Sequence, residues 1–197
     1  MEKLKLSDSL IIGKGANRTC YRHPEDETKC IKIPHSKNCA TQILESNYLK
    51  KLQKSEISWR HLSRYYGETD TNLGMGYSYE LIQNYDQTIS LSITQILEQR
   101  KTEQDLNIIR STLDDFKSFI IEQNIIVRNL RPYNIVLRKD SPESSHAVLI
   151  DNFGHHNHHF HFSDVSSYFA KKRAHKKWNS FVSYLAKHYP NDFSQLR

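Results

Sequence analysis

The sequence predicts an α+β fold in which a small antiparallel sheet precedes a mostly helical second half. Short strand-like segments separated by turn signals fill the first third, and amphipathic stripes with helical spacing follow. Hydrophobic residues make up 37% of the 197 residues and aromatic residues 11%, which is enough for a buried core and excludes global disorder. We expect two lobes that share one core, residues 1–82 and residues 83–197.

The first lobe is predicted from three strand-like segments and one helical stripe. Residues 10–12, 19–21 and 29–33 are rich in apolar and β-branched residues and are separated by Gly-rich and Pro-containing turns. They indicate an antiparallel three-strand start. Apolar positions 40, 43, 44, 48 and 52 predict a helix with one buried face, and Glu45 lies beside that face. Residues 77–82 predict a further strand that ends in polar residues.

The second lobe is predicted to be mostly helical. Apolar residues at 106, 109, 113, 116 and 120 indicate a long helix that ends before Asn124. Residues 127–137 alternate between loop and strand character, and residues 147–150 form a short apolar strand. The last helix is indicated by Trp178, Phe181, Val182 and Leu185.

Charge and cysteine usage narrow the class of protein. The chain has 28 Lys and Arg against 22 Asp and Glu, a net charge of +6, which favours an anionic partner without choosing nucleic acid, nucleotide phosphate or acidic protein. No apolar run approaches the roughly 20 residues of a membrane span, so we expect a cytoplasmic protein with no transmembrane segment. Three cysteines spaced nine and eight residues apart are typical of reduced, buried thiols.

Three features of the first lobe have both a plain and a functional interpretation. Gly13-Lys14-Gly15 follows an apolar strand and is either a tight hairpin or a flap whose bare backbone approaches phosphates. Lys32 is flanked by isoleucines in a strand, which projects it to the opposite face, as a solvated edge residue or toward a phosphate. Glu45 could pair with Lys32 and hold its ammonium group in place.

The order of these features resembles that of protein kinases. A glycine-rich hairpin, a strand lysine, a helix glutamate, a linker strand and a long helix precede the loop 127–135 and the segment 150–154. In this resemblance Asn134 matches a metal-binding Asn, Asp151 matches the Asp of the DFG motif, and Asn129 stands at the position of the catalytic Asp. The implied cofactors are ATP and Mg²⁺. The implied nucleotide-binding residues are Gly13, Gly15, Arg18, Lys32, Glu45, Glu80 and Ile82.

A closer resemblance, to the YrbL family of small bacterial kinase-like proteins of the PhoP regulatory network, covers nearly the whole chain. Its motifs are Cys20-Tyr21-x-His23-Pro24-Glu25-Asp26, Cys30-Ile31-Lys32-Ile33, Tyr65-Tyr66-Gly67, Gly74-x-Gly76-Tyr77, Leu130-x-Pro132-x-Asn134-Ile135 and Asp151-Asn152-x-Gly154. The resemblance implies a bilobal kinase-like fold with an antiparallel-sheet N-lobe and a shortened, mostly helical C-lobe. It also implies that Asn129 is typical of the group, and it supplies no substrate.

Three departures from the kinase pattern shape the functional hypothesis. Asn129 has no basic oxygen near neutral pH, and a general base typically contributes about 10²–10⁴-fold to the rate. Arg18 replaces the third glycine of the flap and either clamps a phosphate or a partner's carboxylate or is solvated. Asn152 interrupts the DFG order and leaves the role of Phe153 open. The leading hypothesis is an ATP-binding pseudokinase or weak phosphotransferase, and the alternative is an interaction module that does not bind nucleotide.

Two further segments carry open alternatives. Five histidines between His155 and His161 are either a transition-metal site or a solvated, pH-sensitive loop. The run Lys171–Lys177, placed just before the last helix, is either a solvated first turn or a site for a protein partner or acidic surface. Cations at a helix N-terminus oppose the helix dipole, which favours a binding role. The run has no interleaved aromatic residues, so nucleic acid is an unlikely partner.

Overall fold

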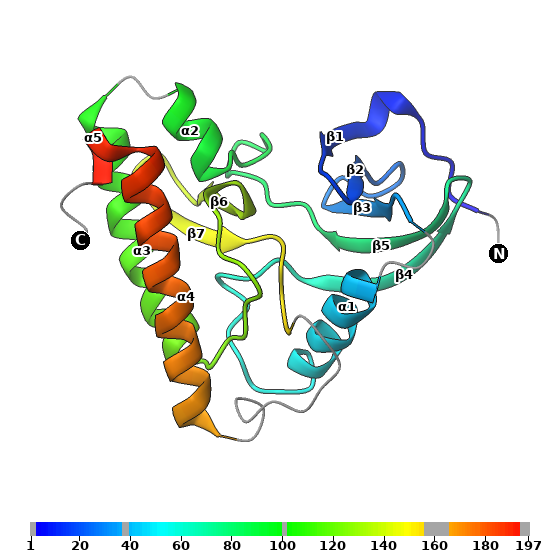
Figure 1. The fold of residues 1–197 in the computed structure, drawn as a ribbon. Coiled ribbons are helices and arrows are strands. Elements are labelled where there is room, and N and C mark those ends of the chain that lie inside the picture. Colours follow the sequence, from blue (N-terminus) through cyan, green and yellow to red (C-terminus); the bar gives the residue numbers. More distant parts are fainter. Residues whose placement is uncertain (1–2, 37–39, 100–101, 156–165, 194–197) are drawn as a thin grey trace.

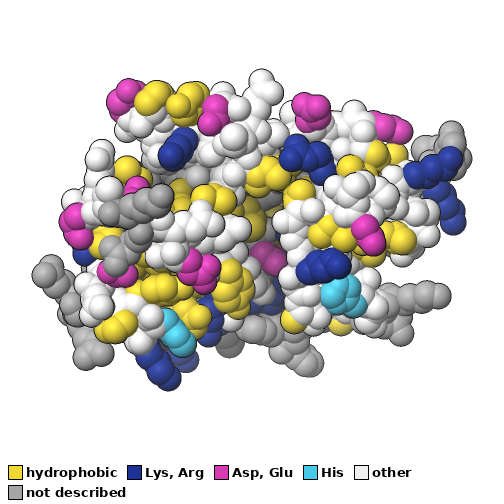
Figure 2. All heavy atoms as spheres, turned by 90° about the horizontal axis from the view of Figure 1, so that it is seen from above, with side chains coloured by type: hydrophobic (Ala, Val, Ile, Leu, Met, Phe, Trp, Pro, Cys, Tyr) yellow, Lys and Arg dark blue, Asp and Glu magenta, His cyan; other side chains and the backbone are white. Residues whose placement is uncertain are grey.

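The computed structural model describes residues 3–36, 40–99, 102–155 and 166–193, which form an α+β fold (Figure 1). A five-stranded antiparallel sheet of order β1-β2-β3-β5-β4 occupies one half of the molecule, and α3 and α4 lie side by side in the other. The two-stranded sheet β6-β7 lies against α3, between the two halves. Figure 2 shows a hollow between them.

The elements follow the chain in a simple order. The strands are β1 (Ile11–Lys14), β2 (Arg18–Arg22), β3 (Lys29–Pro34), β4 (Tyr65–Thr71), β5 (Gly74–Glu80), β6 (Ile135–Lys139) and β7 (Ser145–Leu149). The helices are α1 (Ala40–Leu52), α2 (Ile93–Gln99), α3 (Glu103–Glu122), α4 (Ser167–His188) and α5 (Pro190–Phe193), with short 3₁₀ turns at Asp8–Leu10 and Pro132–Asn134. The α+β class is therefore confirmed.

The predicted three-strand start is confirmed by the register of β1, β2 and β3. Cys20 pairs with Lys32, and the two isoleucines that flank Lys32 pair with neighbouring β2 residues. Ile31 and Ile33 are buried on one face of the sheet in a cluster with Leu6 and Tyr21. Because side chains alternate along a strand, Lys32 projects to the other face, toward the C-terminal half of the molecule.

Helix α1 has the predicted bounds but buries a different face. Ile43, expected in the core, is 45% exposed, whereas Glu45 is fully buried. The buried residues of the helix are Gln42, Glu45, Ser46, Leu49 and Leu52. The predicted buried face was therefore wrong at Ile43 but right at Leu52, and Tyr48 packs against the core. The Glu45 carboxylate is held inside by ion pairs with residues from elsewhere in the chain.

The long helix predicted before Asn124 is confirmed as α3. Thr102 and Asp105 form a capping box, in which the Thr102 hydroxyl accepts from the Asp105 N–H and the Asp105 carboxylate accepts from the Thr102 N–H. The chain leaves the helix through Asn124, whose φ is 54°. The apolar stripe of α3 packs against β7 and α4.

The last helix, α4, starts earlier than predicted and contains the basic run Lys171–Lys177, so the placement of that run before the helix was wrong. Ala170, Ala174 and Trp178 are all buried at a spacing of four, so the face that packs against the core extends through the run. None of the helices in the described ranges is long and apolar enough to cross a membrane.

Candidate functional site

Most of the predicted site residues line one cavity of about 670 Å³ between the sheet and the loop that precedes β6. The cavity wall comes from the β1–β2 turn, from β2 and β3, from residues 128–134 and from the segment after β7. The predicted residues found in it are Gly13, Gly15, Arg18, Lys32, Asn129, Asn134 and Asp151. Residues more than 130 positions apart in sequence are thus brought to a single site.

Glu80 and Ile82, predicted to contact the nucleotide, are not among the residues that line this cavity. The Glu80 carboxylate lies 3.6 Å from the Arg138 guanidinium. The Ile82 side chain is 4% exposed and packs with Val136 and Val148. Both residues instead line a separate, smaller cavity, because β5 ends in contact with the β6–β7 side of the molecule.

Glu45 forms the centre of a buried ion cluster behind the cavity wall. Its Oε2 accepts from Arg128 at 2.5 Å and from the Asn152 N–H at 3.1 Å. Its Oε1 accepts from Arg18 at 3.2 Å and from the Tyr79 hydroxyl at 3.0 Å. Burial alone would raise the pKa of Glu45, but the cations around it outweigh burial, and its pKa lies below the ordinary value. The carboxylate is therefore charged in the folded protein at neutral pH.

The predicted ion pair between Lys32 and Glu45 is not formed. The Lys32 ammonium donates to the carbonyl of Ile150 at 2.5 Å and lies 4.1 Å from the centre of the Tyr79 ring. Arg128 and Arg18 occupy the Glu45 oxygens instead. Burial, together with the charge of Arg18, lowers the pKa of Lys32. Lys32 thus stays at the cavity wall, and no carboxylate within the described ranges contacts its ammonium group directly.

Arg18, at the position of the third glycine, is neither solvated nor directed away from the site. Its guanidinium bridges Glu45 and Asp151 and also donates to the side chain of Gln42. The side chain is 17% exposed. Arg18 thus clamps carboxylates of its own chain, a role that was not predicted from the sequence.

Asn134 and Asp151, the predicted metal ligands, both lie in the cavity wall. Asn134 is 5% exposed, and its Nδ2 is buried without a hydrogen-bond partner. A half-turn of the amide would present its oxygen in place of the nitrogen. Mg²⁺ typically takes one or two protein oxygens and completes its shell with phosphates and water. An orphaned buried amide beside Asp151 in a cavity wall suits this demand, and these two residues would hold the ion.

The segment after Asp151 explains what the inserted Asn152 does. Asn152 has a φ of 67°, a left-handed conformation that Asn tolerates, and its N–H reaches both Glu45 and Asp151. Phe153 is then fully buried in the main core. Gly154, with a φ of 82°, sits where a Cβ would lie 2.9 Å from Tyr48. The Asn152 N–H therefore links Asp151 to the ion cluster around Glu45, and the chain that follows places Phe153 in the core.

Arg128 is the functional residue that the sequence reasoning missed. It is 4% exposed, donates to Glu45 and donates to the carbonyl of Thr41 at 3.0 Å. The available signal was a single cation directly after the apolar residues 125–127, since a charge in a buried segment requires a partner. Nothing in the local sequence identifies that partner as Glu45, 83 positions away.

Two predictions about cysteine and histidine have partial outcomes. Cys20, in the cavity wall, and buried Cys30 are free thiols, as expected, whereas Cys39 is outside the described residues. Of the histidine cluster only His155 is described, so its predicted metal or pH role stays a prediction. Within the described parts of the chain, no three His, Cys, Asp or Glu side chains group so that they could hold a metal ion.

Comparison with known proteins adds the family. The family model described as "PhoP regulatory network protein YrbL" matches residues 4–186, nearly the whole chain. The chain belongs to the YrbL family. Two relatives, each named "Uncharacterized protein YrbL", come from Escherichia coli strain K12 and Shigella flexneri. Each is 31% identical over 154 residues, which cover 77% of this chain and 73% of the relative. The predicted family is confirmed.

Proposed function

We propose that this YrbL-family chain is a kinase-like regulatory protein that binds ATP with Mg²⁺ in the cavity described above. The observation that carries this proposal is the convergence of the Gly13–Gly15 turn, Lys32, Asn134 and Asp151 on one cavity. The family description, a protein of the PhoP regulatory network, supports a role in bacterial signalling.

The role proposed for each residue of the cavity wall follows from the charge of its side chain. Lys32 and Arg18 would neutralise phosphate oxygens, while Asn134 and Asp151 would hold the metal ion, which supplies further charge neutralisation when bound. Arg18 now contacts the Asp151 carboxylate, so a cation at Asp151 competes with the guanidinium. Binding of a metal–nucleotide complex therefore requires Arg18 to leave Asp151, which frees its guanidinium for a phosphate.

Phosphoryl transfer is proposed to be weak or absent. Asn129 lies in the cavity wall, where its amide can orient an acceptor hydroxyl but cannot take the proton that the hydroxyl loses. The missing general base corresponds to roughly 10²–10⁴-fold in rate. The protein would thus act mainly through nucleotide-dependent changes in its own state, as a pseudokinase or a weak phosphotransferase.

A thermal-shift titration with ATP and Mg²⁺ tests the proposal. Ligand at one hundred times its dissociation constant stabilises a protein by about 2.7 kcal/mol, or about 5–10 °C for a domain of this size. We expect this shift for the parent protein and its loss in Lys32→Ala and Asp151→Ala. Lys51→Ala, an exposed lysine of α1, is the charge-matched control and should keep the shift. No shift of the parent protein at millimolar nucleotide would overturn the proposal.

Restoring the carboxylate tests the assigned role of Asn129. In Asn129→Asp, the new base can take the proton of an acceptor hydroxyl as that oxygen bonds to the γ-phosphorus and ADP leaves. We expect ³²P transfer to rise by at least tenfold over the parent protein. An unchanged rate in a variant that still binds ATP would indicate that no acceptor reaches Asn129.

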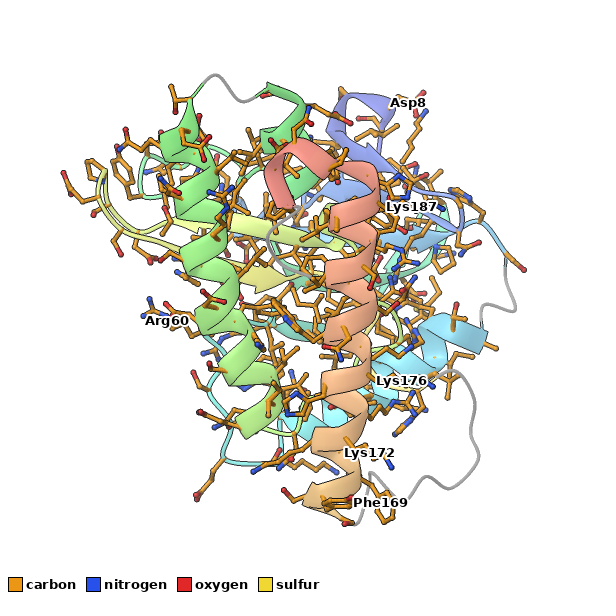
Figure 3. The ribbon with its side chains drawn as sticks, turned by 60° about the vertical axis from the view of Figure 1, so that its left-hand side comes forward. Asp8, Arg60, Phe169, Lys172, Lys176 and Lys187 are labelled. Carbon is orange, nitrogen blue, oxygen red and sulfur yellow. The ribbon has the colours of Figure 1, made fainter. Side chains whose placement is uncertain are left out.

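The alternative function, an interaction module that does not use nucleotide, is favoured by one specific observation on α4. This 22-residue helix contains no Asp or Glu, and Lys171, Lys172 and Lys176 are exposed and form no ion pair within the described residues. Figure 3 shows Lys172 and Lys176 along the outer side of the helix, with Phe169 at its start. An acidic protein surface would complement this face.

A salt titration separates the two functions. Binding to an acidic protein partner through α4 should weaken steeply with ionic strength and be lost when Lys171, Lys172 and Lys176 are changed to Gln, with no effect of ATP. A partner interaction that responds to ATP and survives these changes would exclude the alternative and support the cavity.

A further inference from the structure

The carbonyl groups of Glu80 and Ile82, at the strand end predicted to bind the nucleotide, have hydrogen-bond partners in their own chain. The Glu80 carbonyl accepts from the Ser63 hydroxyl at 3.1 Å, and the Ile82 carbonyl accepts from the Ser90 N–H at 3.0 Å. Ile82 is also buried against Val136. Discrimination among bases needs donors and acceptors that face the base edges, and these two carbonyls already have internal partners.

The wall of the large cavity has the opposite character. Four of its side chains, Lys14, Arg18, Lys32 and Arg128, are cationic, and within the described ranges they face Asp151 in the wall and Glu45 directly behind it, so a surplus of about two positive charges remains. Such a surplus of positive charge in a concave site attracts a ligand with several negative charges. The strength of this attraction depends on the number and spacing of the phosphates in the ligand. It does not depend on which base is attached to them.

The glycine turn adds uncharged contacts suited to the same ligand. A Cβ built on Gly13 would meet no atom within 4 Å, so the backbone faces open space there. The Gly15 N–H donates to the Arg18 carbonyl at 2.9 Å, which closes the turn and fixes its shape. A bare, fixed backbone turn beside four cations lets phosphate oxygens approach closely.

We propose that this site selects the phosphate chain of its ligand and not the base. Its ligand class is an oligophosphate, carried by any nucleoside triphosphate or present as an inorganic chain. This inference rests on the proposed function in one respect, that the cavity holds a phosphate-bearing ligand. It goes beyond that function because the site then recognises the phosphates of ATP and not its adenine base.

Calorimetric titration of the full chain with four ligands tests the proposal: ATP, GTP, inorganic tripolyphosphate and adenosine, the first three with Mg²⁺. We expect dissociation constants within about threefold for ATP, GTP and tripolyphosphate, and no binding of millimolar adenosine. A tenfold preference for ATP over GTP or over tripolyphosphate would overturn phosphate selection while leaving the nucleotide function intact. Binding of tripolyphosphate alone would overturn the nucleotide function and support phosphate selection. No binding of any ligand would overturn both.

A matched pair of variants locates the site. Lys14→Ala removes one cation from the cavity wall and should weaken the binding of ATP, GTP and tripolyphosphate in parallel, by about tenfold or more each, since a hydrogen bond to a charged group is lost. Lys51→Ala removes the same charge from the exposed side of α1 and should leave all three constants unchanged. Equal constants for Lys14→Ala and the parent protein would contradict the proposal.

Discussion

The ion cluster around Glu45 and the apolar interface between α3 and α4 both have a fully buried centre but differ in kind. Glu45 and Phe181 are both fully buried. Phe181 packs in a cluster of hydrophobic side chains, which stabilises the fold directly. Glu45 and its two arginines have been removed from water at a cost of several kcal/mol per ion, and an apolar core of equal volume is often as stable. In the function proposed above, the cluster positions residues of the cavity beside it, whereas the helix interface stabilises the fold.

The largest expected effect comes from removing the centre of the cluster. Glu45→Ala leaves Arg128 buried without its carboxylate and should lower the free energy of unfolding by about 3–5 kcal/mol, measured by urea denaturation. It should also abolish the thermal shift with ATP and Mg²⁺, because Arg18 loses one of its anchors. A loss below about 1 kcal/mol would show that the cluster is not paired in solution.

A substitution in the interface between α3 and α4 should lower the stability of the protein without changing ligand binding. Phe181→Ala creates a cavity against α3 and should lower the free energy of unfolding by about 3–5 kcal/mol, again by urea denaturation. The further stabilisation that a saturating ligand adds should be the same as in the parent protein. If ligand binding were lost as well, the two regions would not be separable as described.

Lowering the pH should weaken the ion cluster around Glu45 but not the apolar interface between α3 and α4. The pKa of Glu45 lies below its unfolded value of 4.5, so its contribution to stability is present above about pH 4.5 and is lost as the pH falls toward the folded pKa. Each pKa unit corresponds to about 1.4 kcal/mol. The difference in unfolding free energy between the parent protein and Glu45→Gln should shrink between pH 6 and pH 3. A difference that is constant over this range would contradict the assigned shift.

The smallest effect is expected for a solvent-exposed ion pair between α1, the helix that carries Glu45, and strand β4. Lys50 contacts Glu68 at 2.8 Å, and both side chains are 44% exposed. Lys50→Gln should change the free energy of unfolding by about 0.5 kcal/mol or less and leave ligand binding intact. A loss comparable to that of Glu45→Ala would mean that burial does not distinguish the two ion pairs.

Local sequence patterns predicted where helices and strands lie in the chain better than they predicted which face of each is buried. The bounds of α1 follow from its apolar spacing, and the three-strand start follows from alternation and turns. The buried face of α1 did not follow, because Arg128 holds Glu45 inside and no local pattern encodes a contact across 83 positions. The same contact explains why Lys32 lacks the predicted carboxylate partner.

The site was predictable as a set of residues but not as a set of contacts. The order of motifs identified Lys32, Asn134 and Asp151, and all three line the cavity. The positions of Glu80 and Ile82 depend on how β5 meets the β6–β7 sheet, which is a tertiary property. The bridge from Arg18 to Asp151 likewise depends on how closely the two halves approach.

The central claim, that the charged cavity binds a phosphate-bearing ligand, is tested most directly by calorimetry of the parent protein and Lys32→Ala with ATP and Mg²⁺. One binding site per chain is predicted for the parent protein, and at least a tenfold weaker dissociation constant for Lys32→Ala, because the variant removes a buried cation from the cavity wall. Equal affinity in the two proteins, or no heat of binding up to millimolar ligand in the parent protein, would contradict it.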